Sequence, residues 1–273
     1  MYPILFQIGS LKIYSYSLFI FLGFMISVET AILLSKHSNL KKADFLDAAF
    51  IGIFSGIVGD KILYILQNSN KPLYDLFNFS QYLEGGLVIY GGLILSSICL
   101  SIYIKIKKIN FIKFCDMAFL VLPLGIAIGR IGCFLNGCCY GIISQSKFGV
   151  KYPKFYSVKY GLIGSEAFLE HLHKGYVKHS DLFSMPVYPT QLISSFANLI
   201  IFILLLLTYK KIKISGIVPI QFLLLYSIFR FFIEFIRAEP RYYLNLTLSQ
   251  YISIALFCLS IFGIFKILIK LRL

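Results

Sequence analysis

The chain has 273 residues, of which 58% are hydrophobic and only 14% are charged, and its mean hydropathy of +0.82 excludes an ordinary soluble domain. Apolar runs of about twenty residues recur along the sequence, so we predict a polytopic membrane protein. The net charge of +14 could suggest a nucleic-acid partner, but the lysines flank the apolar runs, and we therefore expect no nucleic-acid binding.

The positions of the lysines predict the topology. Lysines follow the first, third, fifth and last apolar runs, among them Lys36, Lys105, Lys210 and Lys266, and the positive-inside rule makes these ends cytoplasmic. We predict an all-α fold, a polytopic membrane helical bundle of about seven transmembrane helices, with the N-terminus outside and the C-terminus cytoplasmic. In this prediction residues 1–273 form a single integral membrane domain. Residues 137–187, between spans four and five, form an extracytoplasmic cap.

Polar residues mark the first three predicted spans. Residues 1–13 are short and mostly apolar and are expected at the outer interface, and Tyr14 and Tyr16 then open the first span, residues 14–35. In the second span, residues 46–67, Asp60 and Lys61 are adjacent, which predicts different partners for them. The third span, residues 84–104, begins EGGLVIYGG, where two glycine pairs bracket Tyr90. This pattern predicts either a bare helix face beside one hydroxyl or simple helix packing.

The fourth span, residues 114–136, runs into LPLGIAIGRIGCFLNGCCYG at 122–141. Arg130 lies inside this apolar run, where an arginine costs a few kcal/mol on insertion scales and is a functional hypothesis by default. Glycines around it permit the close approach of a helix or a ligand. The alternative is that Arg130 snorkels to an interface and the glycines only pack helices. Asp116 lies about 21 Å before Arg130 along the helix, so we expect it to neutralise a basic group near the cytoplasmic side.

The predicted cap is rich in Lys, Tyr and His, and residues 165–174 are expected to form a short amphipathic helix. An H-x-H pair at His171 and His173 can bind metal, but no thiol or carboxylate pattern completes a ligand set. Cysteines at 133, 138 and 139 form no C-x-x-C pair, and their spacing is poor for zinc. We therefore assign no residue to a metal site.

The sixth span carries the second arginine cluster. Tyr226, Arg230, Glu234 and Arg237 follow one another at spacings of four, four and three, which predicts one narrow helical face within residues 216–236. Glu234 can pair with either arginine, leaving one guanidinium for a ligand, and a purely structural ion pair is the alternative. The fifth span begins at YPTQL, residues 188–192. The last span, residues 248–269, is featureless apart from Ser249 and Gln250.

Arginine is used sparingly, since only five of the 26 basic residues are arginine and three of them lie within or at the edge of apolar runs. A guanidinium binds phosphate bidentately and stays charged when desolvated. Two intramembrane arginines with glycine-rich helices suit an amphiphile with an anionic head. We predict a phospholipid whose phosphodiester is held by Arg130 and Arg230 while its tails remain in the bilayer.

At these residues the chain resembles the prolipoprotein diacylglyceryl transferases. The resemblance is carried by five motifs in the family's order: YSYSLFIFLGF at 14–24, EGGLVIYGG at 84–92, GRIGCFLNGCCYG at 129–141, YPTQL at 188–192 and YSIFRFFIEFIR at 226–237. They span most of the chain.

The resemblance implies a transferase of the bacterial cytoplasmic membrane that transfers the diacylglyceryl group of phosphatidylglycerol to the lipobox cysteine of prolipoproteins. This is the first step of lipoprotein maturation, and the family uses no metal or soluble cofactor. It implies that Arg130 and Arg230 bind the phosphate and stabilise its departure, with Tyr90 as a further catalytic residue. The implied substrate-binding residues are Tyr16, Lys61, Asn136, Gly137, Gly141, Tyr226, Glu234 and Arg237.

The chain departs from the family pattern at several positions. Tyr90 stands where many members have histidine, Cys133 and Cys138 replace an asparagine and an acidic residue of the signature, Lys61 replaces an arginine, and Ser194 replaces a glutamate. An inactive or altered paralogue is therefore an alternative. A second alternative is a transport-type or non-catalytic membrane protein that recognises an anionic lipid, although no clear inverted repeat with broken helices supports transport.

Overall fold

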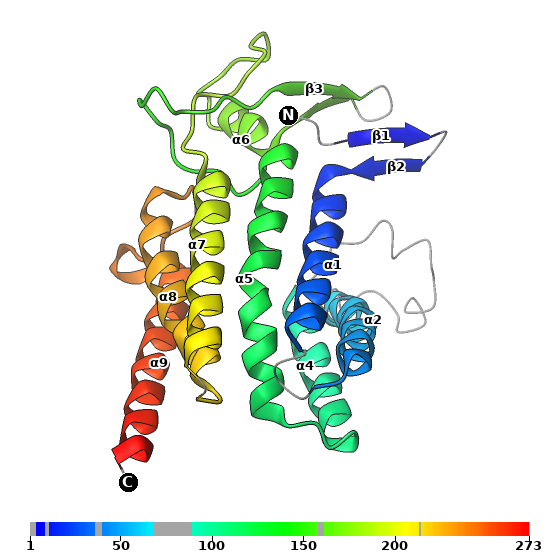
Figure 1. Cartoon of the computed structure of the whole chain (residues 1–273). Helices are drawn as coiled ribbons and strands as arrows, with labels where there is room; N and C mark the ends of the chain where they lie inside the picture. The colour runs from blue at the N-terminus through cyan, green and yellow to red at the C-terminus, as the bar shows by residue number, and fades with distance from the viewer. Residues whose placement is uncertain are drawn as a thin grey trace. The chain divides into compact units, whose positions relative to one another are not determined.

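The computed structural model describes residues 4–8, 11–35, 40–67, 89–157, 161–212 and 214–272 (Figure 1). The chain forms two compact units. The first unit comprises Met1–Glu29 and Asp116–Leu273, and the second comprises Thr30–Cys115. We describe each unit by itself.

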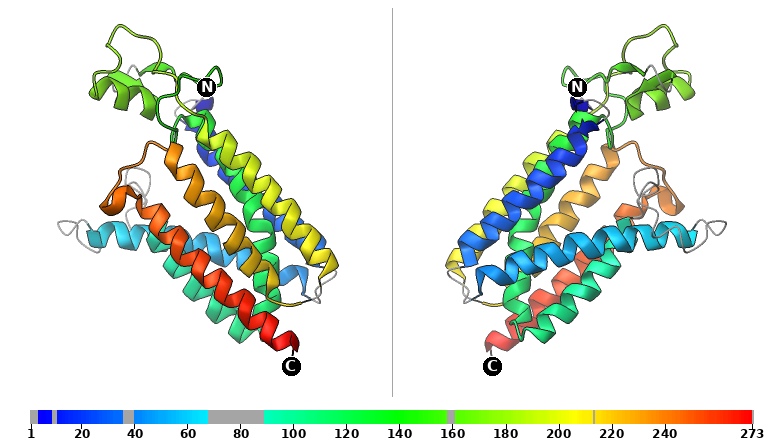
Figure 2. Two further views of the ribbon diagram at one scale, coloured as in Figure 1. Left: turned by 90° about the vertical axis from the view of Figure 1, so that its left-hand side faces the viewer. Right: turned by 90° about the vertical axis from the view of Figure 1, so that its right-hand side faces the viewer.

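The first unit is built from α1 (Ser15–Ser35), α5 (Phe111–Asn136), α7 (Thr190–Lys211), α8 (Ile217–Ile233) and α9 (Leu248–Arg272), of which α1 and α5 cross the unit boundary. Helix α8 packs against both α7 and α9 (Figure 2). Small residues bring α1 against α5, because a methyl group on Gly23 would lie 2.8 Å from the carbonyl oxygen of Gly125. The Ser27 hydroxyl donates to the Val121 carbonyl at 3.2 Å across the same contact.

Asp116 has a different partner from the one that the sequence predicts. Its buried carboxylate accepts hydrogen bonds from the backbone N–H groups of Gly216, at 2.8 and 3.0 Å, and Val218, at 3.3 Å. The prediction that it neutralises a basic group is therefore wrong. The carboxylate instead caps the first turn of α8, where unpaired N–H groups and the helix dipole favour a negative charge.

The segment between α5 and α7 contains a short hairpin of β3 (Lys154–Ser157) and β4 (Gly161–Gly164), and helix α6 (Glu166–His173). The predicted helix at 165–174 is confirmed, and the Ser165 hydroxyl caps it by accepting from the Phe168 N–H at 3.2 Å. A second hairpin, β1 (Ile4–Ile8) with β2 (Leu11–Tyr14), precedes α1. Neither hairpin is predicted by the sequence. Both lie at the end of the first unit opposite the C-terminus (Figure 1).

The second unit contains α2 (Lys42–Gln67) and α4 (Ile89–Ile106), which pack against each other. A methyl group on Gly59 would lie 2.4 Å from the Gly91 carbonyl oxygen, so the backbones touch. Asp60 accepts a hydrogen bond from the Gly92 N–H at 2.7 Å. The glycine pair after Tyr90 therefore packs helices, as the simpler of the two sequence interpretations has it. Residues 84–88, which carry the first pair, lie outside the described residues.

The predicted membrane bundle is confirmed. Six helices of the described chain are long and apolar enough to cross a membrane, and a shorter apolar helix, Gly91–Ile106, occupies the place of the third predicted span. The helices begin and end within a few residues of the predicted spans. Their boundaries follow from the lysine-rich and glycine-rich segments that flank each apolar run.

Candidate functional site

The arginine cluster of the sixth span is held together by Glu234. Its carboxylate lies 3.1 Å from Arg230 Nη2 and 3.6 Å from Arg237 Nε, and the Glu234 side chain is 1% exposed. Among the described residues neither Glu234 oxygen accepts a hydrogen bond of good geometry. The Glu234 carboxylate therefore interacts with the two guanidinium groups mainly through their opposite charges. The ion pairs that the spacing predicts do form.

Arg237 does not share the helical face that the sequence predicts for it. Helix α8 ends at Ile233, a 3-10 turn follows at Glu234–Ile236 (η2), and Arg237 itself is extended. The tighter turn ends the regular helical face before Arg237, although Arg237 Nε still lies 3.6 Å from the Glu234 carboxylate. The Arg237 guanidinium is buried and donates to the Glu239 carboxylate at 2.6 Å, so it is neutralised within the protein.

The Arg230 side chain is 17% exposed and that of Arg237 is 5% exposed, so Arg230 is the more accessible of the two arginines that pair with Glu234. Its Nη2 donates to the Ser249 hydroxyl at 2.8 Å. Ser249 lies in the first turn of α9, which begins with reciprocal hydrogen bonds between Thr247 and Gln250. The sequence marks Ser249 and Gln250 as the polar residues of this span but predicts no role for them. The T-x-x-Q capping pattern at 247–250 is the signal that could have placed the helix start.

Arg130 lies near the end of α5 and within electrostatic range of both Arg230 and Tyr16. In the part of the chain that the structure describes, no group forms a hydrogen bond or ion pair with the Arg130 guanidinium. Arg130 thus lies within electrostatic range of Arg230 and Tyr16, and the roles assigned to the three residues stay predictions. An intermediately exposed guanidinium beside a second one is suited to bind an anion such as a phosphate.

The loop after α5 turns sharply at Gly137, whose φ of +80° is the left-handed conformation that glycine favours. A methyl group there would also lie 2.9 Å from Ser165 Cβ. The preceding residue, Asn136, ends α5, and its amide makes no hydrogen bond within the described chain. Gly137 thus ends helix α5. The Asn136 side-chain amide has no hydrogen-bond partner among the described residues and is available to bind a ligand.

Two side chains of the YPTQL motif hold this loop in place. The Thr190 hydroxyl donates to the Cys139 carbonyl at 2.8 Å, and Gln191 Nε2 donates to the Cys138 carbonyl at 2.7 Å. Gln191 Nε2 also donates to the Tyr152 hydroxyl at 2.8 Å. Buried polar groups of this kind are costly unless paired, so the motif fixes the loop's backbone.

Gly141 joins this loop to the end of the arginine cluster. Its N–H donates to the Tyr188 carbonyl at 3.0 Å, and it forms an antiparallel bridge with Arg237. A methyl group on Gly141 would lie 2.6 Å from the Ile236 carbonyl oxygen and 2.8 Å from Tyr188. The close approach of three backbone segments therefore requires glycine at this position.

We expect Gly141→Ala to lower stability by about 1 to 3 kcal/mol, because the backbones around the added methyl group must move apart. The thermal unfolding midpoint of the purified protein in detergent measures this effect. Gly56→Ala in α2 is the matched control, since no atom lies within 4 Å of the added methyl group. Equal midpoints for both variants would contradict the close approach at Gly141.

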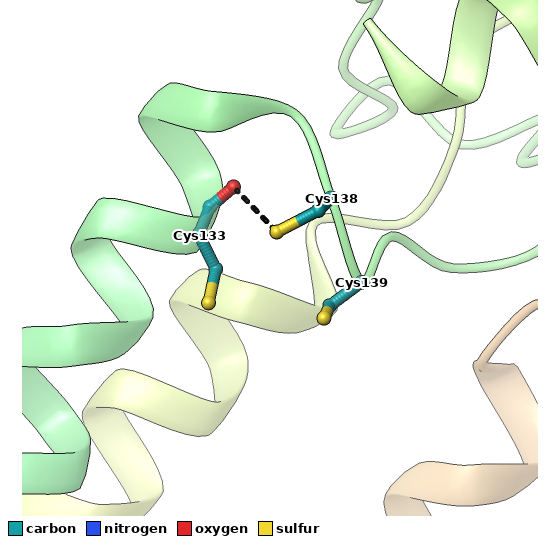
Figure 3. Close-up of side chains that lie close together, drawn as sticks. All are labelled: Cys133, Cys138 and Cys139. Carbon is teal, nitrogen blue, oxygen red and sulfur yellow. Dashed lines mark hydrogen bonds between the residues drawn. The ribbon is translucent and has the colours of Figure 1, made fainter. Parts of the chain in front are cut away.

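Three cysteines gather where α5 ends. The thiol sulfurs of Cys133, Cys138 and Cys139 lie within 4.8 Å of one another (Figure 3). Arg130 and Arg237 are within electrostatic range of Cys139. The sequence spacing argued against a metal site, but the turn at Gly137 brings together thiols that the spacing places in two different elements.

The histidines of the cap do not form such a cluster. The His171 ring is buried and packs edge-on against Tyr140 and Tyr176, with ring centroids 6.2 and 5.7 Å apart. Burial lowers the pKa of His171 and favours its neutral form. The geometry identifies His171 as a packing residue.

The second unit contains the remaining predicted site residues. Lys61 is buried in α2, and its Nζ lies 5.3 Å from the centroid of the Tyr64 ring. Tyr90 is the second residue of α4, and its side chain lies outside what the structure describes. The roles assigned to these two residues stay predictions.

An apolar groove of about 210 Å³ lies between α8 and α9. Ser227 and Phe231 line it from α8, and Ser253 and Phe257 line it from α9. Ser227 lies one turn before Arg230, and Ser253 lies one turn after Ser249, so the lining of the groove is about one helical turn from the Arg230–Ser249 contact. Tyr226 lies at the same level, with its ring stacked on Phe222.

The chain is similar to proteins of one family along nearly its whole length. The family model described as prolipoprotein diacylglyceryl transferase matches residues 3–266. A phosphatidylglycerol–prolipoprotein diacylglyceryl transferase of Clostridium botulinum is 32% identical over 99% of this chain and 98% of its own length. One from Clostridium tetani is 32% identical over 96% of each chain. A Clostridium perfringens protein named as transferase 2 is 31% identical over 91% of this chain and 88% of its own.

Proposed function

This chain belongs to the prolipoprotein diacylglyceryl transferase family, and on that premise we propose which of its residues perform the transfer. The protein is a membrane transferase that moves the diacylglyceryl group of phosphatidylglycerol to prolipoproteins. The arrangement of Arg130 and Arg230 is the observation that carries the assignment of the site.

We propose that Arg130 and Arg230 hold the phosphodiester of phosphatidylglycerol. Arg130 lacks an anionic partner in the described chain, while Arg230 is oriented by Glu234 and Ser249. Both guanidinium groups can donate to phosphate oxygens. Negative charge grows on the departing phosphate as the transfer proceeds, and fixed cations in a poorly solvated site stabilise that charge more than they stabilise the bound substrate.

The groove along α8 and α9 supports a place for one acyl chain. A diacylglyceryl group is an apolar tail pair joined to a phosphate through a short glycerol, so a tail site must begin next to the phosphate site. The groove is lined mainly by aromatic and aliphatic side chains, and its Ser227 and Ser253 lie about one helical turn from Arg230 and Ser249. Tyr226 and Tyr16 would line the same region near the glycerol.

The acceptor in this proposal is the thiol of the lipobox cysteine of a prolipoprotein. Its sulfur attacks the diacylglyceryl carbon that bears the phosphate, a carbon–sulfur bond forms, and the carbon–oxygen bond breaks. Glycerol phosphate leaves with the electron pair, and the thiol proton is lost. We further propose that Asn136, Gly137 and Gly141 shape the pocket and that Glu234 with Arg237 braces the arginine cluster. For Tyr90 and Lys61, which belong to the second unit, we keep the catalytic and substrate-binding roles that the family resemblance implies.

The site's location supports the predicted orientation. Arg130 lies in the last two turns of α5, and Arg230 lies in the last turn of α8. The cap segment follows the same end of α5 (Figure 1). The lysines that follow the first, third, fifth and last apolar runs place the other end in the cytoplasm by the positive-inside rule. We therefore propose a site in the outer half of the cytoplasmic membrane, with the N-terminus outside and the C-terminus inside.

A defined assay tests the transfer. The purified protein in phosphatidylglycerol bilayers is incubated with a short lipobox peptide, and mass spectrometry is expected to find a diacylglyceryl adduct on the peptide cysteine together with released glycerol phosphate. A peptide with serine in place of cysteine is the control and should remain unmodified. Movement of lipid without any covalent product would favour a transporter, and peptide binding without turnover would favour a non-catalytic protein. Tyr90→Phe in the same assay tests the Tyr90 hydroxyl, which an unchanged rate would exclude from the chemistry.

A further inference from the structure

Three cysteines meet at the end of α5 and take no part in the transfer described above. Cys133 lies in the last turn of α5, and Cys138 and Cys139 lie in the loop after it (Figure 3). All three are free, and their sulfurs lie within 4.8 Å of one another. Rotation about the side-chain bonds can shorten such a separation to the roughly 2.05 Å of a disulfide. The cluster is therefore a place where oxidation can join two thiols.

The backbone after α5 folds back on the end of the helix. The N–H groups of Gly137 and Cys138 both donate to the Cys133 carbonyl, at 3.0 and 3.2 Å. This pattern is typical of a helix that ends with a left-handed residue, and it brings the residue after the turn against the last helical turn. Cys139 is also left-handed, with a φ of +59°, and the Thr190 hydroxyl donates to its carbonyl at 2.8 Å. The fold thus maintains an uncommon backbone conformation that keeps the three thiols together.

The surroundings of Cys139 favour its thiolate. The thiols of Cys133 and Cys138 donate hydrogen bonds to its sulfur, and Arg237 and Arg130 are within electrostatic range of it. The hydrogen bonds and the two positive charges lower the pKa of Cys139 below its usual range. Because the thiolate is the form that attacks peroxides and disulfides, Cys139 is the reactive thiol of the three.

The acidic groups near Cys139 leave one cation unpaired. Glu166 accepts a hydrogen bond from the backbone N–H of Cys139, and Glu239 pairs with Arg237. Arg130 has no ion pair among the described residues, so its charge remains to stabilise the thiolate. The other titratable neighbours are phenols, which are neutral at pH 7: Tyr16 of α1 and Tyr152 of the cap segment.

Cys133 is the disulfide partner that the geometry favours for Cys139. The Cα atoms of the adjacent residues Cys138 and Cys139 are about 3.8 Å apart, which is shorter than the roughly 4.4 Å minimum of ordinary disulfides. The Cys138 thiol is also directed at the Cys133 carbonyl, to which it donates at 3.8 Å (Figure 3). Cys133 and Cys139 are separated by the whole turn and carry no such restriction. We therefore expect these two to pair and Cys138 to stay reduced.

We propose that Cys139 is a redox-reactive thiol that forms a disulfide with Cys133, and that this bond sets how tightly Arg130 holds the phosphate of phosphatidylglycerol. The second half of the proposal rests on the proposed function, because it concerns the same phosphate site. In the orientation proposed above, the loop faces the outside of the membrane, where disulfides form and persist. The oxidant is a small peroxide such as hydrogen peroxide.

The reaction joins two sulfurs and reduces one peroxide. The Cys139 thiolate attacks one oxygen of hydrogen peroxide, so a sulfur–oxygen bond forms, the oxygen–oxygen bond breaks, and hydroxide leaves with the electron pair and takes a proton from solvent. The Cys133 sulfur then attacks the Cys139 sulfur of this sulfenic acid. The sulfur–sulfur bond forms, the sulfur–oxygen bond breaks, and the second hydroxide takes the Cys133 thiol proton and leaves as water. The two sulfurs lose two electrons, and the peroxide gains them.

The disulfide changes the charge beside the phosphate site. Cys133 lies three residues after Arg130 on α5, so the two side chains are about one helical turn apart on the same face. In the reduced protein the Cys139 thiolate offsets part of the positive charge of Arg130. A disulfide carries no charge, so Arg130 attracts the phosphate more strongly once the bond has formed.

Disulfide mapping tests the pairing. Full-length reduced protein in detergent is treated with hydrogen peroxide, its remaining thiols are alkylated, and its peptides are analysed by mass spectrometry. We expect a disulfide between Cys133 and Cys139 with an alkylated Cys138, and dithiothreitol should reverse it. Cys133→Ser should stop at a sulfenic acid on Cys139, whereas Cys138→Ser should still form the disulfide. A disulfide that joins Cys138 to either neighbour, or no disulfide in the cluster, would overturn the proposal.

The alkylation rate of the unaltered protein tests the thiolate without any substitution. A free thiol with a pKa of about 8.5 loses roughly 80-fold in alkylation rate between pH 8 and pH 6, because its thiolate fraction falls. A thiol with a lowered pKa keeps its thiolate over this range, so we expect the rate at Cys139 to fall by less than about tenfold. A fall as large as that of the free thiol would refute the role of Cys139.

The transfer assay tests the effect on phosphatidylglycerol. Peroxide is removed before the lipobox peptide is added, and the KM for phosphatidylglycerol in mixed micelles is expected to be about threefold or more lower after oxidation. Cys139→Ser lacks the thiolate and should show the same low KM with no response to peroxide. Cys138→Ser should respond as the unaltered protein does. An unchanged KM in both the oxidised protein and Cys139→Ser would overturn the effect on phosphate binding.

The redox proposal and the transfer proposal fail in different ways. If the reduced protein forms no adduct while Cys133 and Cys139 still pair, the proposed transfer site fails and the redox-reactive pair stands. If the adduct forms but Cys133 and Cys139 do not pair under peroxide, the redox proposal fails and the transfer site stands.

Discussion

Arg130→Lys is expected to lower kcat/KM for diacylglyceryl transfer by about 100-fold or more, while the protein still inserts and folds. Lysine keeps the positive charge in α5 but loses the planar pair of donors that grips a phosphate. Removing a single donor that stabilises the transition-state charge typically costs between about 10² and 10³ in rate. The adduct assay in phosphatidylglycerol bilayers measures the effect.

The matched control for Arg130→Lys is Arg241→Lys. Arg241 is exposed in the same unit, and its Nη2 donates to the Phe235 carbonyl at 3.1 Å, outside the proposed phosphate site. We expect that variant to keep nearly the full rate. Arg230→Lys should behave like Arg130→Lys. Near-normal turnover in both Arg130→Lys and Arg230→Lys, at unchanged unfolding midpoints, would refute the phosphate site.

Glu234→Gln is expected to destabilise the protein by about 3 kcal/mol or more and to reduce the transfer rate. The substitution keeps the size of the side chain but removes the only carboxylate that Arg230 and Arg237 share among the described residues. Breaking a buried pair leaves an uncompensated charge, which typically costs about 3 to 5 kcal/mol. Arg230 would also lose one of the two groups that orient it.

The thermal unfolding midpoint in one detergent compares this variant with Glu239→Gln. Glu239 also pairs with Arg237, but its side chain is 40% exposed, so solvent screens the pair and the loss should be about 1 kcal/mol or less. A larger loss at Glu239 than at Glu234 would show that Arg237 alone, and not the shared carboxylate, maintains the cluster.

The sequence predicts a contact of this site correctly where both residues lie on one helix, because their spacing then decides whether the two side chains meet. Glu234 pairs with Arg230 because residues four apart share a helical face, and that rule needs no knowledge of other helices. Glu234 also pairs with Arg237, three residues later, but regular helix ends before Arg237 because the chain tightens into a 3-10 turn after Ile233. The turn coincides with the bridge between Arg237 and Gly141, a partner almost one hundred residues earlier in the chain.

Spacing rules do not predict contacts between segments that are far apart in the sequence. The sequence predicts a basic partner for Asp116 because opposite charges attract. In the structure the N-terminus of α8, the positive end of its helix dipole, lies nearby, and its backbone N–H groups donate to the carboxylate instead. Ser249 stands out in the sequence only as a polar residue in an apolar run, and no partner is predicted for it. In the structure α9 packs against α8 and brings Ser249 to Arg230.

The sequence by itself therefore determined the membrane character, the approximate ends of the spans and the family, because long apolar runs and local motifs are properties of short stretches of chain. Only the tertiary structure decided that Arg130 and Arg230 approach each other and that three cysteines with an unpromising spacing meet at one point. The physical reason is that helix packing and a turn with left-handed residues at Gly137 and Cys139 set those distances, and neither is encoded in the residues' separation along the chain.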